Sequence, residues 1–179
     1  SETEVIDFRK QISDSKPYFV YVGAMHPRKN VERLLLAFDA FKKETESDFK
    51  LVLVGRKAWQ NEGMEKAYEN MQFQADVIFT GRVSDEELSK TLASAYALTY
   101  VPYFEGFGLP IIEAQSCGIP VITSDASSMP EVLGEGGILV NPMKQEEIKN
   151  AMVSMLDKDF YQSKKEASLQ NVKRFSWDK

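Results

Sequence analysis

Two glycines and two glutamates lie close together in the segment Tyr103–Glu113, whose sequence is YFEGFGLPIIE. Gly106 and Gly108 fall between a predicted strand and a helix that is predicted to begin near Pro110. Glycine allows backbone N–H groups to turn inward and to approach a ligand closely. The N-terminus of the helix adds partial positive charge, so this segment predicts an anion site suited to a phosphate.

The two glutamates, Glu105 and Glu113, do not suit a phosphate directly, because a carboxylate repels it. They suit hydroxyl groups, since a carboxylate can accept two hydrogen bonds from the vicinal diol of a ribose or a hexose. Helical side chains lean toward the N-terminus, so Glu113, expected in the first turn, should lean back toward the glycines. Glu105 precedes the glycines and is expected on the other side of the phosphate. A diphosphate flanked by two polyols is a nucleotide sugar; the alternative is a solvated Glu105 and a Glu113 that only complements the helix dipole.

A basic cluster, His26-Pro27-Arg28-Lys29-Asn30, follows the first predicted strand. Two cations at a helix N-terminus disfavour the helix, and a residue that breaks a local rule in a ligand-bearing loop is a functional candidate. Lys29 offers a compact charge to a phosphate, and Arg28 can contact two oxygens at once. We therefore expect a bound diphosphate here, with a solvated basic turn as the alternative. Asn30 is expected to be the N-cap of the following helix.

Two glycine turns, Gly55–Lys57 and Gly81–Val83, follow predicted strand ends. Their backbone groups could read a nucleobase with Val83 against its face, or they are ordinary turns. The sequence contains no G-x-S-x-G elbow, no Cys/His metal spacing and no P-loop, and no third glycine follows Gly106 and Gly108 at dinucleotide-fold spacing. A nicotinamide site is therefore unsupported, and Cys117 is expected to serve packing.

Short apolar runs that alternate with amphipathic segments must position these residues. The runs are uniformly apolar, which is typical of strands covered on both faces. The predicted strands are Tyr18–Gly23, Lys50–Val54, Asp76–Thr80, Ala97–Val101, Ile119–Thr123 and Gly137–Val140. The predicted helices are Val31–Glu46, 58–73, a segment from the capping box at Ser84 to Ser94, Pro110–Cys117, Lys144–Leu156 and Lys158–Phe175.

Strand and helix alternate about five times, which predicts an α/β fold: a Rossmann-like, doubly wound parallel sheet of about six strands in a single domain. Ligands of such sheets bind beyond the carboxyl ends of the strands, at the point where the strand order reverses. Five loops lie at that edge by this rule, and the glycine segment, the basic cluster and both glycine turns fall in four of them.

Composition limits the classes of protein to which the chain can belong. Its 179 residues suit about one domain. The 22 Lys and Arg against 27 Asp and Glu give a net charge of −5, which argues against non-specific nucleic-acid binding. Every stretch of eighteen residues carries a charge, so no membrane-spanning helix and no membrane contact of this domain are expected. One cysteine excludes an internal disulfide and favours a reducing compartment.

The two ends of the sequence lead to an expectation about domain organisation. Residues 1–16 are polar, lack an initial Met and contain no signal peptide, and we expect a linker remnant there. Residues 17–179 are expected to form a nucleotide-sugar-binding domain. Ser176 resembles the start of a further helix, so a truncated C-terminal helix is expected.

Three stretches together resemble the C-terminal domain of the retaining glycosyltransferases called group 1, or family four. They are Tyr21–Asn30, Phe79–Val83 and Glu105–Ala114, and the third contains that family's pair of glutamates eight positions apart. The resemblance extends from about Pro17 to Trp177. It implies a GT-B enzyme with two Rossmann-like domains, in which an absent N-terminal domain holds a saccharide or lipid-linked acceptor and this domain holds the nucleotide-sugar donor.

The resemblance also implies roles for individual residues. Lys29 is expected to contact the donor diphosphate, Glu113 the ribose and Glu105 the hydroxyls of the transferred sugar, with Lys29 and Glu105 the catalytic pair. Val83 is expected to border the base. Backbone N–H groups for phosphate and sugar are expected from Gly106, Phe107, Gly108 and Leu109.

The chain departs from the family at Ala24, where many members carry an arginine. Either Arg28 takes over part of that role, or stabilisation of the diphosphate rests more on Lys29. The resemblance implies no metal or other cofactor, a cytoplasmic location with membrane association through the absent domain left open, and no sustained turnover by this chain alone. The basic cluster resembles that of bacterial mannosyltransferases and favours GDP-mannose, with UDP-hexoses left open. A GT-B sugar-nucleotide epimerase and a non-catalytic nucleotide-binding module are the alternatives.

Overall fold

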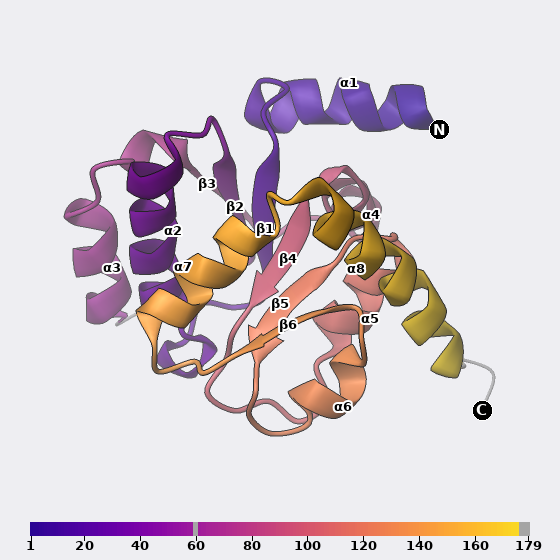
Figure 1. Ribbon diagram of the computed structural model, residues 1–179. Coiled ribbons are helices and arrows are strands. Elements are labelled where there is room, and N and C mark those ends of the chain that lie inside the picture. Colours follow the sequence, from indigo (N-terminus) through magenta and orange to yellow (C-terminus); the bar gives the residue numbers. More distant parts are fainter. Residues whose placement is uncertain (59–60, 176–179) are drawn as a thin grey trace.

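Six parallel strands form one sheet at the centre of the molecule (Figure 1). The computed structural model describes residues 1–58 and 61–175. Each predicted strand is present, with ends within two residues of the expected ones. The strands are β1 Tyr18–Val22, β2 Lys50–Val54, β3 Val77–Gly81, β4 Ala97–Tyr100, β5 Val121–Ser124 and β6 Gly137–Val140.

The strand order is β3-β2-β1-β4-β5-β6. The chain therefore builds outward from β1 to β3, returns to place β4 on the other side of β1, and builds outward again. This order confirms the predicted doubly wound sheet, and its switch point lies between β1 and β4. Loops that follow β1 and β4 thus meet at the carboxyl edge of the sheet.

Helices cover both faces of the sheet, which explains why the strands are apolar throughout. On one side α2 (Val31–Thr45) packs against α3 (Glu62–Glu69) and α7 (Gln145–Ser154). On the other side α5 (Leu109–Ser116) packs against α4 (Asp85–Ser94) and α8 (Lys158–Asn171). Figure 1 shows these two groups on either side of the strands. The described residues also contain three short 3₁₀ turns: η1 Pro27–Lys29, η2 Gln74–Asp76 and η3 Val172–Arg174.

The expected linker at residues 1–16 is wrong as a description of the backbone, because α1 occupies Glu2–Ser13. Ser1 and Glu4 form a capping box that begins this helix. Its partly buried side chains Val5, Phe8 and Ile12 recur at helical spacing, and both Nε and Nη2 of Arg9 donate to the Ser94 carbonyl at 3.0 and 2.8 Å. Helix α1 therefore packs on α4 at the end of the sheet opposite the carboxyl edge (Figure 1).

A second element that the sequence did not predict is α6 (Met129–Leu133), in the segment after β5 that was expected to be loop up to Pro130. Pro130 fits within the first turn of this short helix, where a missing N–H costs nothing. Two other expectations involve residues outside the described ranges. The first is the part of the predicted 58–73 helix at residues 59–60, and the second is the helix start at Ser176.

Candidate functional site

The switch point of the sheet brings Lys29 and Glu105 into contact, although 76 positions separate them in the sequence. Lys29 ends η1, directly after β1, and Glu105 lies in the loop after β4. The Lys29 ammonium donates to Glu105 Oε2 and, at 3.0 Å, to the Tyr100 hydroxyl. The Tyr100 hydroxyl lies 2.9 Å from the same carboxylate oxygen. A cation, an anion and a phenol thus form one cluster at the carboxyl edge.

Burial and charge set the protonation states in this cluster. The side chains of Lys29 and Glu105 are only 11% and 22% exposed, so solvent screens their pairing weakly. Partial burial pushes the pKa of Glu105 upward, but hydrogen bonds from Lys29 and Tyr100 outweigh it and hold that pKa below its ordinary value. Burial, and then the neighbouring carboxylate, raise the pKa of Tyr100. Glu105 is therefore held as a carboxylate, beside a phenol that keeps its proton.

The glycine segment makes a tight turn into the N-terminus of α5. Gly108 is the N-cap of α5 and has φ +78°, a conformation that favours glycine. A Cβ added there would lie 2.7 Å from Cε of Met129, so α6 packs directly on this turn. Ser128 Oγ donates to the Gly106 carbonyl at 2.8 Å. The short helix α6 therefore holds the loop that includes Gly106, Phe107, Gly108 and Leu109, and Phe107 is 53% exposed at its surface.

Glu113 is the fifth residue of α5, which places it beyond the first turn in which it was expected. Its side chain is half-buried, and this burial, together with the charge of Asp85, raises the pKa of its carboxyl group. Asp85 begins α4, directly after the Gly81–Val83 turn. The carboxyl group of Glu113 on α5 therefore senses the charge of Asp85 at the start of α4.

A cavity of about 390 Å³ lies where β1, β2 and β3 end. Its walls are mostly apolar, and its charged residues are Arg56 and Arg82. Gly55 lets two loops approach here, since a Cβ at this position would lie 2.1 Å from the Gly23 carbonyl oxygen. The complete lining is Val22, Gly23, Ala24, Val54, Gly55, Arg56, Arg82, Val83 and Leu88. Val83 thus borders a cavity at the rim whose mostly apolar walls suit a flat ring.

Arg28 and Asn30 lie on either side of Lys29 but have different roles in the structure. Arg28 is exposed, and its carbonyl accepts a hydrogen bond from the Tyr103 N–H at 3.0 Å, which ties the β1 loop to the β4 loop. Asn30 is the N-cap of α2, as predicted, but it has φ +63° and its side chain makes no capping hydrogen bond. Its buried amide instead donates to the carbonyls of Val101 at 2.9 Å and Pro142 at 2.8 Å. Asn30 therefore joins three loops of the rim.

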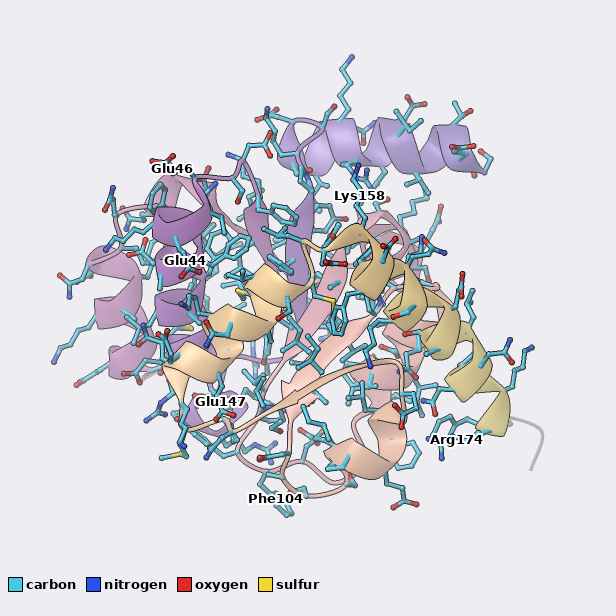
Figure 2. All side chains as sticks on the ribbon, viewed as in Figure 1. Glu44, Glu46, Phe104, Glu147, Lys158 and Arg174 are labelled. Atoms are coloured by element: carbon cyan, nitrogen blue, oxygen red, sulfur yellow. The ribbon has the colours of Figure 1, made fainter. Side chains whose placement is uncertain are left out.

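Sequence reasoning did not identify Tyr100 or Arg33 as part of this region. Tyr100 stands in a strand whose apolar pattern predicts a core residue. Only its place at the carboxyl end of β4 could have indicated that its hydroxyl reaches the site. Arg33 donates to the Tyr103 hydroxyl, and its guanidinium carbon lies 5.6 Å from the centroid of the Tyr103 ring. Figure 2 shows where this region lies: the exposed Phe104, next to Glu105, marks the edge of the molecule opposite α1.

Two searches of the described residues bear on other kinds of site. Within residues 1–58 and 61–175, no group of three or more His, Cys, Asp and Glu side chains is arranged to hold a metal ion. None of the helices in the described ranges is both long and apolar enough to cross a bilayer.

Comparisons with known proteins extend over nearly the whole chain. The model of the family "Glycosyl transferases group 1" matches residues 2–174. An O-antigen chain mannosyltransferase B from Escherichia coli is 35% identical over 162 residues, which are 90% of this chain and 42% of that protein. This chain therefore spans less than half the length of that relative.

Two solved structures share the fold. The C-terminal domain of a group 1 family glycosyl transferase (LpcC) from Francisella tularensis has a TM-score of 0.80 at 20% identity, and the match covers 93% of this chain and 91% of that domain. HepE from Anabaena, in complex with UDP and glucose, has a TM-score of 0.86 at 17% identity, with coverage of 97% and 48%. The fold of this chain is that of one Rossmann-like half of a GT-B enzyme.

Proposed function

The chain belongs to the glycosyl transferases of group 1, and on that premise we propose that its carboxyl edge binds a nucleoside diphosphate hexose. In this proposal the chain is the donor-binding part of a retaining hexosyltransferase that transfers the hexose to a saccharide or a lipid-linked acceptor. The single observation that carries the proposal is the Lys29–Glu105 pair at the switch point, next to the N-terminus of α5. A cation suited to phosphate and a carboxylate suited to hydroxyls are there side by side.

In the proposal, each group of such a donor is assigned to one feature of the rim. The cavity beside Val83 would hold the base, and Glu113, on α5, would accept hydrogen bonds from the ribose. The segment from Gly106 to Leu109 and the Lys29 ammonium would bind the diphosphate. Glu105, on the far side of Lys29, would then meet the hexose. Each assignment follows from position along the edge and from the charge that each group requires.

The proposed reaction breaks the bond between the anomeric carbon and the diphosphate oxygen. Negative charge grows on the leaving diphosphate, where Lys29, Arg28 and the amides at the start of α5 would stabilise it. The acceptor hydroxyl oxygen would bond to the anomeric carbon on the same face, and its proton would pass to the departing diphosphate oxygen. Glu105 would orient the hexose and ease its developing positive charge. With Ala24 in the place of the family arginine, Lys29 would supply most of the positive charge.

Lys29 can make these contacts without leaving Glu105 completely. An ammonium group carries three N–H donors, and two of them point to Glu105 and Tyr100 in this structure. The third can turn to a phosphate oxygen, and a bound diphosphate would compete for the other two. Binding of the donor would thus exchange one ionic partner of Lys29 for another.

The relatives indicate which base and which sugar to test first. The Escherichia coli relative is a mannosyltransferase, which makes GDP-mannose the first donor to test. HepE was solved with UDP and glucose, which makes UDP-glucose the second. No nucleic acid is expected as a partner, because the chain has a net charge of −5.

Thermal unfolding of the chain with GDP, UDP and ADP tests the binding step, since a ligand that binds the folded state raises its melting temperature. We expect one diphosphate to give a larger rise than the others, and no rise with any of them would contradict the proposal. Donor labelled in its hexose tests turnover. Because the chain covers 42% of the Escherichia coli relative, we expect binding without repeated transfer, and multiple turnovers would overturn that part.

A further inference from the structure

The hydroxyl of Tyr100 is the junction through which Lys29 and Glu105 contact the core. The side chain of Tyr100 is 1% exposed, and its ring stacks on that of Tyr21 with centroids 6.1 Å apart. The Lys29 ammonium lies 5.5 Å from the centroid of the Tyr100 ring. Tyr21 belongs to β1 and Tyr100 to the neighbouring strand β4, so the phenol of Tyr100 has little freedom to move.

The direction of each hydrogen bond follows from the protons available. An ammonium can only donate, so the Tyr100 oxygen accepts from Lys29. The single phenolic proton is then free to be donated to the Glu105 carboxylate at 2.9 Å. Because burial and the adjacent carboxylate raise the pKa of Tyr100, the phenol keeps that proton over the ordinary pH range.

Binding of a diphosphate would change this balance. The phosphate oxygens would draw the Lys29 ammonium toward themselves, and Glu105 would lose part of the contact that now fixes it. The hydrogen bond from Tyr100 does not depend on Lys29, because its donor is mounted on β4 and held by the core. It is therefore the contact that remains to orient Glu105 when the donor is bound.

We propose that Tyr100 is a positioning residue: its hydroxyl keeps the Glu105 carboxylate turned toward the hexose of a bound nucleotide sugar while the diphosphate occupies Lys29. The inference rests on the proposed function of the site. It assigns a role to a tyrosine that the apolar pattern of β4 would otherwise place in the core alone.

The substitution Tyr100→Phe removes the hydroxyl and keeps the ring. Calorimetry would measure the affinities of GDP and GDP-mannose, and of UDP and UDP-glucose, and the pair that the unmodified chain binds more tightly would be used for the variants. We expect the affinity for the diphosphate alone to stay within about twofold. We expect the affinity for the nucleotide sugar to fall about tenfold, because one hydrogen bond to a charged group is lost.

Tyr18→Phe is the matched control. Tyr18 is equally buried on β1, and its hydroxyl donates to the Thr91 carbonyl at 2.6 Å, toward the opposite end of the sheet. We expect this control to lose stability without changing the ratio of the two affinities. A double-mutant cycle with Glu105→Ala adds a readout that a packing role would not move. In the Glu105→Ala background, which leaves no acceptor for the phenol, Tyr100→Phe should have no further effect on that ratio.

Each result separates this inference from the proposed function. Equal losses for the diphosphate and the nucleotide sugar would overturn the positioning role, and so would an unchanged ratio or an undiminished effect in the Glu105→Ala background. In all three results the site would still bind nucleotide, and the proposed function would stand. If the unmodified chain bound neither diphosphate nor nucleotide sugar, the proposed function would fail and the positioning role with it.

Discussion

Lys29 and Glu105 neutralise each other across the switch point of the sheet, so each group competes with the ligand that the other is proposed to bind. A phosphate must share Lys29 with Glu105, and a sugar hydroxyl must share Glu105 with Lys29. Substitutions of the two residues should therefore change binding of a nucleoside diphosphate in opposite directions.

Replacing Lys29 by alanine should weaken binding of the preferred nucleoside diphosphate by about ten- to a hundredfold. The reason is the loss of a charge-assisted hydrogen bond, which contributes about 1.5–3 kcal/mol. Titration calorimetry measures this change. Lys158→Ala is a suitable control, because Lys158 is exposed at the start of α8, far from the rim residue Phe104 (Figure 2). Unchanged affinity of Lys29→Ala would refute the role of this ammonium.

Replacing Glu105 by glutamine should tighten binding of the diphosphate alone by several-fold. The neutral amide no longer holds the Lys29 ammonium, so less interaction is lost when a phosphate takes it. Nucleotide-sugar binding should gain less, because the proposed contact with the hexose is weakened. Competition of GDP against GDP-mannose, and of UDP against UDP-glucose, measures both effects. Weaker binding of the diphosphate by this variant would show that Glu105 does not compete with a phosphate for the Lys29 ammonium.

The hydrogen bonds of the Asn30 amide lead to a prediction about stability. Asn30→Asp keeps the shape and the tolerance for positive φ, but it turns an oxygen toward the carbonyls of Val101 and Pro142. We expect the free energy of unfolding to fall by about 2–4 kcal/mol, because a buried donor pair is replaced by acceptor repulsion. Urea unfolding measures it. Asn70→Asp, at an exposed helix end, is the control and should change stability little.

The sheet could be predicted from the sequence because parallel strands covered on both faces are continuous apolar runs, and tertiary context does not alter that signal. The meeting of Lys29 and Glu105 could also be expected, since loops after neighbouring strands share one edge. Helix α1 could not be recognised in the same way. Its local signs are the capping box and the partly buried Phe8 with its helical neighbours, and its hydrogen bonds to Ser94 depend on a contact 85 positions away.

The side-chain contacts of Asn30 and Tyr100 could not be predicted, because local rules compete with tertiary contacts. Asn directly before a helix usually caps it, but here the positive φ turns the amide toward the β4 and β6 loops. A tyrosine in an apolar strand usually fills space, but the end of β4 lies where a hydroxyl meets two charged groups. Both outcomes depend on a contact between residues 71 positions apart, Asn30 with Val101 and Tyr100 with Lys29, so neither was visible from spacing.

Glu113 is expected to lower the stability of the fold at neutral pH although it contributes to nucleotide binding. Burial, and then the charge of Asp85, raise the pKa of its carboxyl in the folded chain, so the folded state binds this proton more tightly than the unfolded state does. The contribution of Glu113 to stability therefore declines as pH rises from about 4.3 through the raised pKa. Glu113→Gln should be at least as stable as the unmodified chain at pH 7, and this advantage should vanish below pH 4.

The same variant should bind a nucleoside diphosphate about tenfold more weakly, because the ribose would lose a charged acceptor. A 2′-deoxynucleoside diphosphate supplies the matched test, since the unmodified chain should bind it more weakly than the ribonucleotide and the variant should discriminate less. Equal discrimination by both proteins would remove Glu113 from the ribose contact.

Acid should release a buried ion-pair cluster at the other end of the sheet. Asp76 lies 2.6 Å from Lys50 Nζ and 3.2 Å from Nζ of the buried Lys42. Although partial burial pushes its pKa upward, the hydrogen bonds from Lys50 and Lys42 outweigh this and hold that pKa below its ordinary value. The folded state thus binds the proton less tightly than the unfolded state. The stabilisation is complete above the unfolded pKa of about 4, and it is lost as pH falls through the folded value.

Asp76→Asn should therefore lower the free energy of unfolding by about 1–3 kcal/mol at pH 7, since a buried ammonium loses its charged partner. The difference from the unmodified chain should shrink steadily below pH 4, because protonation then removes the same charge from both proteins. Urea unfolding at a series of pH values measures it. Asp48→Asn breaks the exposed pair with Lys16 and should change stability by less than about 1 kcal/mol at any pH. A deficit of Asp76→Asn that stayed constant into acid would mean that this carboxylate stabilises the fold through its shape and not through its charge.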